Sequence, residues 1–176
     1  MIDIQEKLLP VIDNRDKILN NAIKLLTAAN VLKIPSIVSE QYPKGIGRTV
    51  KELKNLLPAD LETLEKIEFS VCANEKFGDA FLNLKFDSGS RDSVILFGVE
   101  SHICVLGTAI DLIEKYNLNV FVAADACGSR DSENHNLALN SMRDIGCFVV
   151  PTETIIYHML GKAGTPEFKK LLPLFK

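Results

Sequence analysis

The chain has 176 residues, of which 47% are hydrophobic and 24% are charged, and its formal net charge is −3. This length suits one core, so we expect residues 1–176 to form a single domain. The scattered lysines and arginines argue against a nucleic-acid-binding protein. No apolar run is long enough to span a membrane, and Asp3 and Glu6 interrupt any signal-peptide pattern. We therefore expect no nucleic-acid partner and no membrane partner.

Apolar runs rich in β-forming residues alternate along the chain with segments of helical periodicity. Residues 1–3 look like the end of a first strand only a few residues long, so this strand is expected to be truncated. Further strands are expected at 34–39, 67–71, 94–99, 120–124 and 147–150, and helices at 13–30, 75–84, 103–116, 132–145 and 152–160. This alternation predicts right-handed βαβ crossovers. The expected fold is a three-layer α/β/α, Rossmann-like domain with a mainly parallel sheet of about six strands.

The four cysteines form no CxxC pair and show no zinc-ligand spacing. Three of them lie in or beside apolar strand-like runs. This pattern fits free thiols in a reducing compartment, which predicts a cytoplasmic protein. The sequence alone leaves a disulfide pair among them open.

Residues 98–104, Gly-Val-Glu-Ser-His-Ile-Cys, join an apolar strand-like run to a segment of helical periodicity. Cys104 is thereby placed at the carboxyl end of a strand and at the start of a helix. Ligands bind at that edge of parallel sheets, and the N–H groups of a helix N-terminus favour a thiolate over a thiol. Position and chemistry suggest a nucleophile. The alternative is an inert cysteine that packs the joint between strand and helix.

The same stretch resembles the motif G-V-x-(S/T)-x-x-C of the isochorismatase-like cysteine hydrolase family, carried here by Gly98, Val99, Ser101 and Cys104. Segments 3–5, 39–45, 66–70 and 123–130 also resemble family motifs and occur in the family's order. Each match is weak alone, but the ordered set covers nearly the whole chain and makes the resemblance specific.

The resemblance implies an Asp-Lys-Cys catalytic triad with Cys104 as nucleophile, Asp3 as base and Lys66 as the cation. The implied reaction cleaves a C–N, amide-type bond of a small-molecule substrate through a thioester at Cys104. Lys66 would hold Asp3 ionised and favour the thiolate. The family also places the oxyanion donors at the backbone N–H groups of Glu100 and Cys104, and makes the peptide bond before Glu100 cis. Without the family pattern, Asp3 and Lys66 would be ordinary solvated residues.

Three further expectations concern the pocket, metals and assembly. Gln41, Tyr42 and Ile103 are expected to line the substrate pocket. The three histidines lie outside 34–66, where the family's nicotinamidase branch carries a metal-binding Asp/His cluster, so we expect no metal and no cofactor. The resemblance and the apolar segment 171–175 predict a homo-oligomer, a dimer or larger.

Two other function classes stay open. One is a catalytically silent interaction protein on the same fold, against which the presence of Asp3, Lys66 and Cys104 argues. The other is a thiol redox sensor that pairs Cys104 with Cys127 or Cys147, which the absence of a CxxC pair weakens. The sequence does not name the substrate.

Overall fold

The fold is built on parallel strands that fall into two groups. The computed structural model describes residues 1–84 and 92–176. In one group β1 pairs with β2, and in the other β4 lies between β3 and β5, all in parallel. Ile2 bridges Ser39 of one group and Gly98 of the other, again in parallel, so residues 1–3 join the two groups. The strands are β1 (Ser39–Gln41), β2 (Leu64–Lys66), β3 (Ser93–Val99), β4 (Asn119–Gly128) and β5 (Phe148–Val150).

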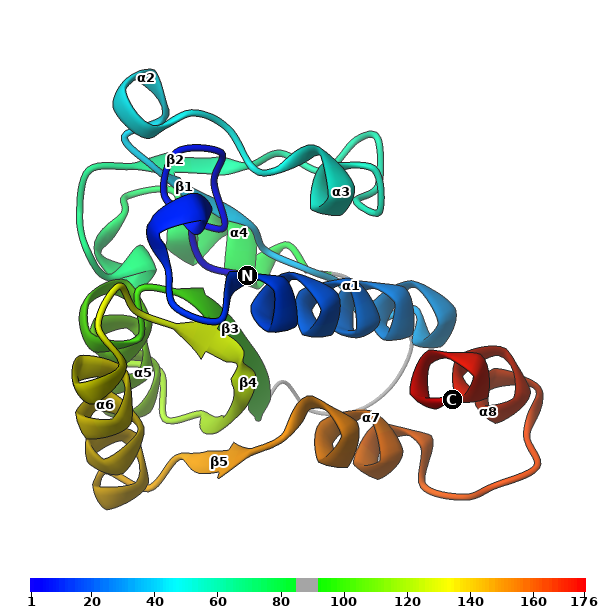
Figure 1. Ribbon diagram of the computed structural model, residues 1–176. Coiled ribbons are helices and arrows are strands. Elements are labelled where there is room, and N and C mark those ends of the chain that lie inside the picture. The colour runs from blue at the N-terminus through cyan, green and yellow to red at the C-terminus, as the bar shows by residue number, and fades with distance from the viewer. Residues whose placement is uncertain (85–91) are drawn as a thin grey trace.

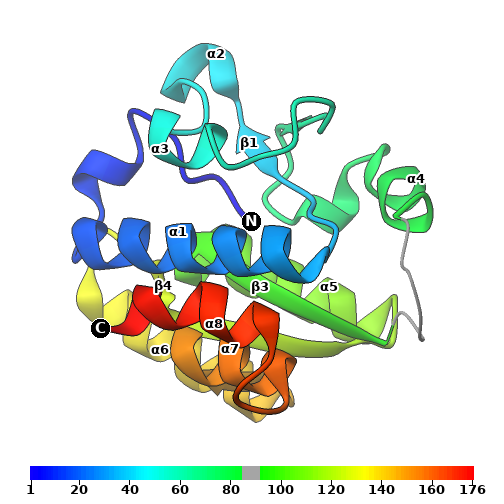
Figure 2. The same ribbon diagram turned by 90° about the vertical axis from the view of Figure 1, so that its right-hand side faces the viewer.

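Helices cover both faces of the sheet, as Figures 1 and 2 show. One layer holds α1 and α7 and the other holds α5 and α6, and all four helices contact β4. The helices are α1 (Arg15–Leu32), α2 (Pro43–Ile46), α3 (Lys51–Lys54), α4 (Phe77–Leu82), α5 (Leu106–Glu114), α6 (Ser132–Asp144), α7 (Thr152–Leu160) and α8 (Pro166–Leu171). The predicted α/β class with parallel pairing is confirmed. The described residues hold five named strands and the Ile2 bridges, so the expected number of about six strands is not confirmed.

Local sequence explains the main elements. The carboxyl half of β3 is buried because it runs through the middle of the core. Helix α1 turns Ile18, Ala22, Leu25 and Leu26 toward that core, at the spacing of one helix face. Helix α6 begins at the N-cap Asp131, whose carboxylate accepts a hydrogen bond from the Asn134 N–H at 2.9 Å.

The prediction of a strand at 67–71 is wrong. Strand β2 ends at Lys66, and the next residues form a bend in which Ile67 and Phe69 are 74% and 65% exposed. The strand expected at 34–39 is displaced, since β1 runs from Ser39 to Gln41 and shares only Ser39 with the predicted range. The helix expected from 103 starts instead as a π-helical turn, Ser101–Val105, which leads into α5.

The carboxyl-terminal segment packs on its own chain. After α8 the 3-10 turn Leu172–Phe175 places the Phe175 ring 5.4 Å from the Tyr157 ring, with Lys24 Nζ 5.2 Å from the Phe175 ring centre. Leu171 is fully buried. Leu174 and Phe175 are half-buried against the core and Pro173 is exposed, so the segment packs only in part on its own chain, and its use as a contact surface stays a prediction.

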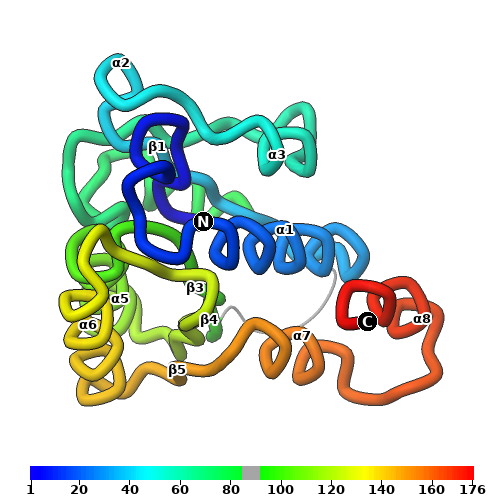
Figure 3. The backbone as a smooth tube through the Cα atoms, in the orientation of Figure 1, coloured from blue at the N-terminus to red at the C-terminus, as the bar shows by residue number. Residues whose placement is uncertain are grey.

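The two termini lie in different surroundings. Figure 3 shows the N-terminus near the middle of the molecule and the C-terminus at its edge beside α8. None of the helices within 1–84 and 92–176 is both long enough and apolar enough to cross a membrane.

Candidate active site

Three side chains from distant parts of the sequence meet at the carboxyl ends of the strands. Asp3 follows the Ile2 bridge, Lys66 ends β2, and Cys104 lies in the π-helical turn after β3. Lys66 Nζ lies 2.7 Å from Asp3 Oδ2 and 3.6 Å from Cys104 Sγ. All three residues are buried. The structure thus brings together the three residues that the sequence singled out for catalysis.

Lys66 is held by more than its ion pair with Asp3. Its ammonium also donates to Gln41 Oε1 at 2.6 Å and to the backbone carbonyls of Glu68 and Phe69 at 3.2 Å each. The side chain of Lys66 has no exposed surface, and a buried ammonium is costly unless it is paired and hydrogen-bonded. The chain bends after β2 so that these carbonyls face the nitrogen, which explains why the strand ends there.

Asp3 is fixed through both its backbone and its side chain. Its N–H donates to the Ser39 carbonyl at 3.2 Å, and its Oδ1 accepts a hydrogen bond from Ser39 Oγ at 2.7 Å. Its φ of 51° lies in the left-handed region, which non-glycine residues visit rarely. Sequence reasoning missed Ser39 as a partner of Asp3. The available signal was its place at the end of the predicted strand 34–39, beside residue 3.

Cys104 is held as a neutral thiol. Burial raises the pKa of its thiol to about 12, the negative charge of Asp3 and a hydrogen bond with it act in the same direction, and Lys66 opposes them. The sequence predicted that the lysine and the helix N-terminus would favour a thiolate. Desolvation and the neighbouring carboxylate outweigh the lysine in the free protein, so the sulfur keeps its proton near an acceptor that can take it.

The turn between β3 and Cys104 is organised around Glu100. The Val99–Glu100 peptide bond is cis, and the Glu100 carbonyl accepts hydrogen bonds from the N–H groups of Ile103 and Val105 at 3.2 Å each. The buried Glu100 carboxylate accepts from the Arg130 backbone N–H at 2.8 Å and from Arg130 Nε at 3.1 Å. This link ties the turn to the segment after β4. Sequence reasoning considered only the backbone of Glu100 and missed the ion pair.

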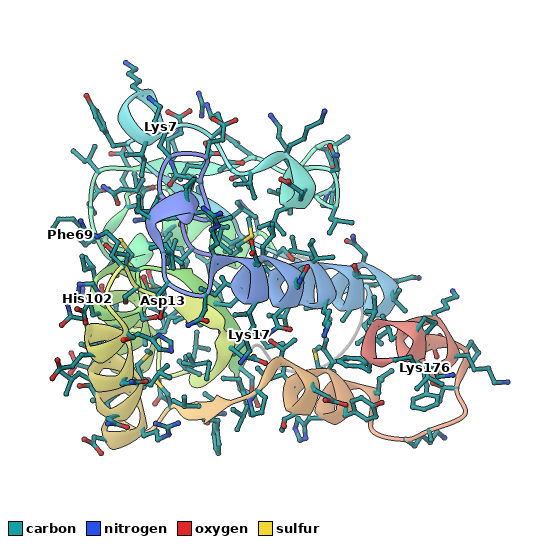
Figure 4. The ribbon with its side chains drawn as sticks, in the orientation of Figure 1. Lys7, Asp13, Lys17, Phe69, His102 and Lys176 are labelled. Carbon is teal, nitrogen blue, oxygen red and sulfur yellow. The ribbon has the colours of Figure 1, made fainter. Side chains whose placement is uncertain are left out.

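Of the three residues expected in the pocket, Gln41 contacts the catalytic ammonium with its side chain. Its amide contacts Lys66, and its Nε2 donates to the Ile67 carbonyl at 3.0 Å. Tyr42 is 56% exposed, with its N–H donating to the Lys66 carbonyl, and Ile103 is half-buried against the core. Figure 4 places Phe69 and His102 on one side of the molecule. His102 Nδ1 and Ser129 Oγ form a hydrogen bond of 2.9 Å.

Within residues 1–84 and 92–176 no group of three or more His, Cys, Asp and Glu side chains is arranged to hold a metal ion. The four cysteines 72, 104, 127 and 147 are free thiols. At the site a thiol, a carboxylate and an ammonium lie close together, with Lys66 Nζ in contact with both Asp3 and Cys104.

Comparison with known proteins decides the family. The family model described as "Isochorismatase domain" matches residues 1–154. The chain belongs to the isochorismatase family. The recognition made from the sequence motifs is therefore confirmed, and at this level of detail the protein is an isochorismatase-like hydrolase.

Relatives in this family match along nearly the whole chain. Isochorismatase domain-containing protein 2 of Bos taurus is 37% identical over 177 residues, which cover 100% of this chain and 81% of that protein. Isochorismatase family protein 1B of Dictyostelium discoideum is 32% identical over 176 residues, which cover 99% and 83%.

Solved structures agree with this assignment. The structure of MAR1 ribonuclease from Caenorhabditis elegans has a TM-score of 0.89 at 36% identity, covering 99% of this chain and 86% of that one. The YcaC gene product of Escherichia coli, described as an octameric hydrolase of unknown specificity, has a TM-score of 0.87 at 23% identity, covering 98% and 84%. The second likeness concerns the fold alone.

Proposed function

We propose that this isochorismatase-family protein is a cysteine hydrolase that cleaves a C–N, amide-type bond of a small molecule through a thioester at Cys104. The observation that carries the proposal is the buried contact of three side chains, in which one ammonium lies 2.7 Å from Asp3 Oδ2 and 3.6 Å from the Cys104 sulfur. A nucleophile, a proton acceptor and a fixed cation are the groups that covalent acyl transfer requires.

In the first step Asp3 accepts the thiol proton while the Cys104 sulfur attacks the carbonyl carbon of the substrate. The carbonyl oxygen becomes an oxyanion, and we assign the backbone N–H groups of Glu100 and Cys104 as its donors. The C–N bond then breaks, and Asp3 returns the proton to the leaving nitrogen. Water attacks the thioester, gives a proton to Asp3, and releases the acid as the thiol is restored.

Lys66 keeps the charge of the site balanced during these steps. Before proton transfer its ammonium pairs with the Asp3 carboxylate, and afterwards it pairs with the sulfur anion. Both partners lie within reach of the same nitrogen, so the negative charge moves only a few ångströms, on the order of the 3.6 Å from nitrogen to sulfur. This arrangement explains how a thiol with a raised pKa serves as a nucleophile, because the thiolate has to exist only while substrate is bound.

We further propose that Gln41, Tyr42 and Ile103 line the substrate pocket and that residues 1–176 act as one domain. A homo-oligomer remains our proposal, supported by the description of the E. coli YcaC product as octameric. A cytoplasmic location also remains a proposal. One relative, 34% identical, is named a secreted isochorismatase effector of Phytophthora sojae, so membership of the family does not fix location.

The competing assignments are weaker. A redox sensor needs an accessible thiol of low pKa, whereas burial raises the pKa of Cys104 to about 12, that of Cys127 to about 12 and that of Cys147 to about 11. A catalytically silent interaction protein does not require a buried contact among an aspartate, a lysine and a cysteine. Ribonuclease activity is suggested by the description of the C. elegans relative. Against it, the cation of this site is buried and already paired with Asp3.

The test is a substrate panel of small primary amides, carbamoyl compounds, a vinyl ether and a short RNA. We expect the wild type to hydrolyse a C–N substrate and to carry its acyl group on the Cys104 peptide when quenched, as read by mass spectrometry. Cys104→Ala should abolish turnover, while the matched control Cys72→Ala retains it. A Cys104→Ala protein that hydrolyses the amide at the wild-type rate would disprove the mechanism. RNA cleavage without amide hydrolysis would favour the ribonuclease.

A further inference from the structure

Three consecutive side chains in the turn after β3 are hydrogen-bonded to one other segment of the chain. The pairs are Glu100 with Arg130 at 3.1 Å, Ser101 with His135 at 2.8 Å, and His102 with Ser129 at 2.9 Å. All three partners lie in residues 129–135, which lead from the end of β4 into the first turn of α6 (Figure 1). Segment 129–135 therefore clamps the turn from one side.

The clamped turn carries the groups on which the proposed acyl transfer depends. Ser101 begins the π-helical turn that ends at Val105, and Cys104 lies within it. The backbone N–H groups assigned as oxyanion donors belong to Glu100 and Cys104, so Ser101 lies between them in the chain. A shift of Ser101 moves these donors relative to the substrate, and a misplacement of about 1 Å can lower a rate by about 10²-fold.

The contact between Ser101 and His135 is the buried one at the centre of the clamp. Ser101 has no exposed surface, so its hydroxyl depends on a hydrogen-bond partner from within the protein. The Arg130 side chain, by contrast, is 61% exposed, and an ion pair with an exposed partner contributes little. His135 is therefore the residue of the clamp whose loss should disturb the turn most.

His135 is half-buried because it also borders a cleft between the start of α1 and α6. The cleft has a volume of about 400 Å³, and its lining includes Asp13 and Lys17 of the neighbouring segment as well as Asn136. The imidazole ring thus meets the turn through Nδ1 and lies beside open space. This position allows His135 to be replaced without changing the core.

We propose that His135 is a positioning residue, which through Ser101 holds the backbone donors of Glu100 and Cys104 where the oxyanion forms. This role rests on the proposed function, because it concerns the acyl-transfer step. His135 acts through Ser101 and takes no part in the proton transfer, which belongs to Asp3. Its loss should therefore slow the reactions of Cys104 that pass through an oxyanion and spare those that do not.

Two reagents separate these reactions on the same sulfur. With p-nitrophenyl acetate the carbonyl oxygen becomes an oxyanion, the bond from sulfur to the acetyl carbon forms, the ester C–O bond breaks, and p-nitrophenolate leaves while Asp3 accepts the thiol proton. Iodoacetamide alkylates the sulfur by direct displacement of iodide, with the proton again passing to Asp3, and forms no oxyanion. Mass spectrometry of the Cys104 peptide after rapid quenching gives both rates.

His135→Phe keeps a ring but removes the nitrogen that faces Ser101, and Ser101→Ala removes the hydroxyl on the other side of the contact. Each should slow acylation about tenfold and leave alkylation within about twofold of the wild type. The double variant should be no slower than the slower single variant, because both changes break the same contact.

Two further variants show that the contact itself is responsible. His135→Asn, whose amide takes the place of Nδ1, should restore most of the acylation rate. The matched control is Asn136→Ala, which removes an exposed side chain from the same helix and the same cleft and should behave as the wild type in both reactions. Circular dichroism checks that each variant is folded, and Ser101→Ala with His135→Asn carries the test if the phenyl ring is not accommodated.

Three results would overturn the role of His135 and leave the proposed function intact. The first is unchanged acylation in both His135→Phe and Ser101→Ala. The second is an equal loss of acylation and alkylation, which would indicate a general loosening of the fold. The third is a double variant about a hundredfold slower than the wild type, which would show that the two residues act separately. A wild-type Cys104 that is alkylated but never acylated would instead overturn the proposed function, and the role of His135 with it.

Discussion

The protonation state of Cys104 separates this site from one with a preformed thiolate. Helix position and a nearby lysine suggested an ionised sulfur, yet burial and Asp3 raise the pKa of the thiol to about 12. The sequence motifs indicate which residues come together in the site. They do not show whether desolvation or the nearby charges dominate the pKa of the thiol, because burial depends on the whole fold. The identities of Asp3, Lys66 and Cys104 were therefore readable from sequence, whereas their resting charges were not.

Replacing Asp3 by Asn should speed up the alkylation of Cys104 and slow the turnover of substrate. The carboxylate raises the pKa of the thiol, so its removal should lower that pKa and leave Lys66 to stabilise the sulfur anion. Alkylation of Cys104 at about pH 8 should speed up, measured by mass spectrometry of the Cys104 peptide. Turnover should fall by about 10²- to 10⁴-fold, because the proton acceptor is lost.

The control for this experiment is Ser39→Ala, which removes the hydrogen bond to Asp3 Oδ1 and keeps the carboxylate. It should change alkylation and turnover much less than Asp3→Asn. If Asp3→Asn leaves alkylation of Cys104 unchanged or slower, then Asp3 does not set the pKa of the thiol as described.

At the level of elements, strand positions could be predicted where the apolar run is buried. The prediction failed where the run is exposed. The run 94–99 lies within β3, but residues 67–70 form the bend after β2, in which Ile67 and Phe69 are exposed, and the buried Val71 begins a 3-10 turn. The backbone there turns to bring the Glu68 and Phe69 carbonyls to Lys66 Nζ. The buried ammonium requires hydrogen-bond acceptors, and this requirement outweighs the β-propensity of the apolar residues. Hydrophobic periodicity does not indicate such a requirement.

Glu40 in β1 ties this strand to the start of α3. Its buried carboxylate accepts from the Thr49 N–H at 2.7 Å, from Thr49 Oγ1 at 2.8 Å and from Arg48 at 2.9 Å. Burial acts to raise its pKa, but these hydrogen bonds outweigh it and hold the pKa below its usual value. Glu40→Ala should lower the free energy of unfolding by about 2–3 kcal/mol, because Thr49 is left without its acceptor. Urea denaturation at neutral pH measures the change.

Arg48→Ala is the matched variant on the other side of this ion pair. The Arg48 side chain is 55% exposed, and exposed partners contribute about 0–1 kcal/mol, so the loss should be small. Arg48 also pairs with Glu65, so equal losses for Glu40→Ala and Arg48→Ala would mean that the two ion pairs of Arg48, rather than the contact of Glu40 with Thr49, join β1 to α3.

For the molecule as a whole, the α/β class and the family followed from the order of motifs along the chain. The division of the sheet into two groups joined by residues 1–3 did not. A pattern of alternating elements predicts parallel pairing but carries no information on which strands are neighbours. The partial packing of segment 171–175 on α1 and α7 could not be chosen from the sequence for a related reason, since an apolar run does not show which surface will cover it.

The buried Met1 amine should make the stability of the whole molecule depend on pH. Its pKa is about 6 in the folded chain, against 8.0 when exposed. Between these values the unfolded chain holds a proton that the folded chain has lost, so the free energy of unfolding should rise as pH increases from 6 to 8. The gain is bounded at about 2–3 kcal/mol and should level off above pH 8. Thermal melts across this range measure it.

Two controls isolate the amine from other groups that titrate nearby. N-terminal acetylation removes the charge of the amine, so the rise in stability from pH 6 to 8 should disappear. His135, whose pKa is lowered by burial, acts with the same sign at lower pH, and His135→Gln removes its contribution. A melting temperature that is flat or falls between pH 6 and 8 in the His135→Gln protein would contradict a buried amine.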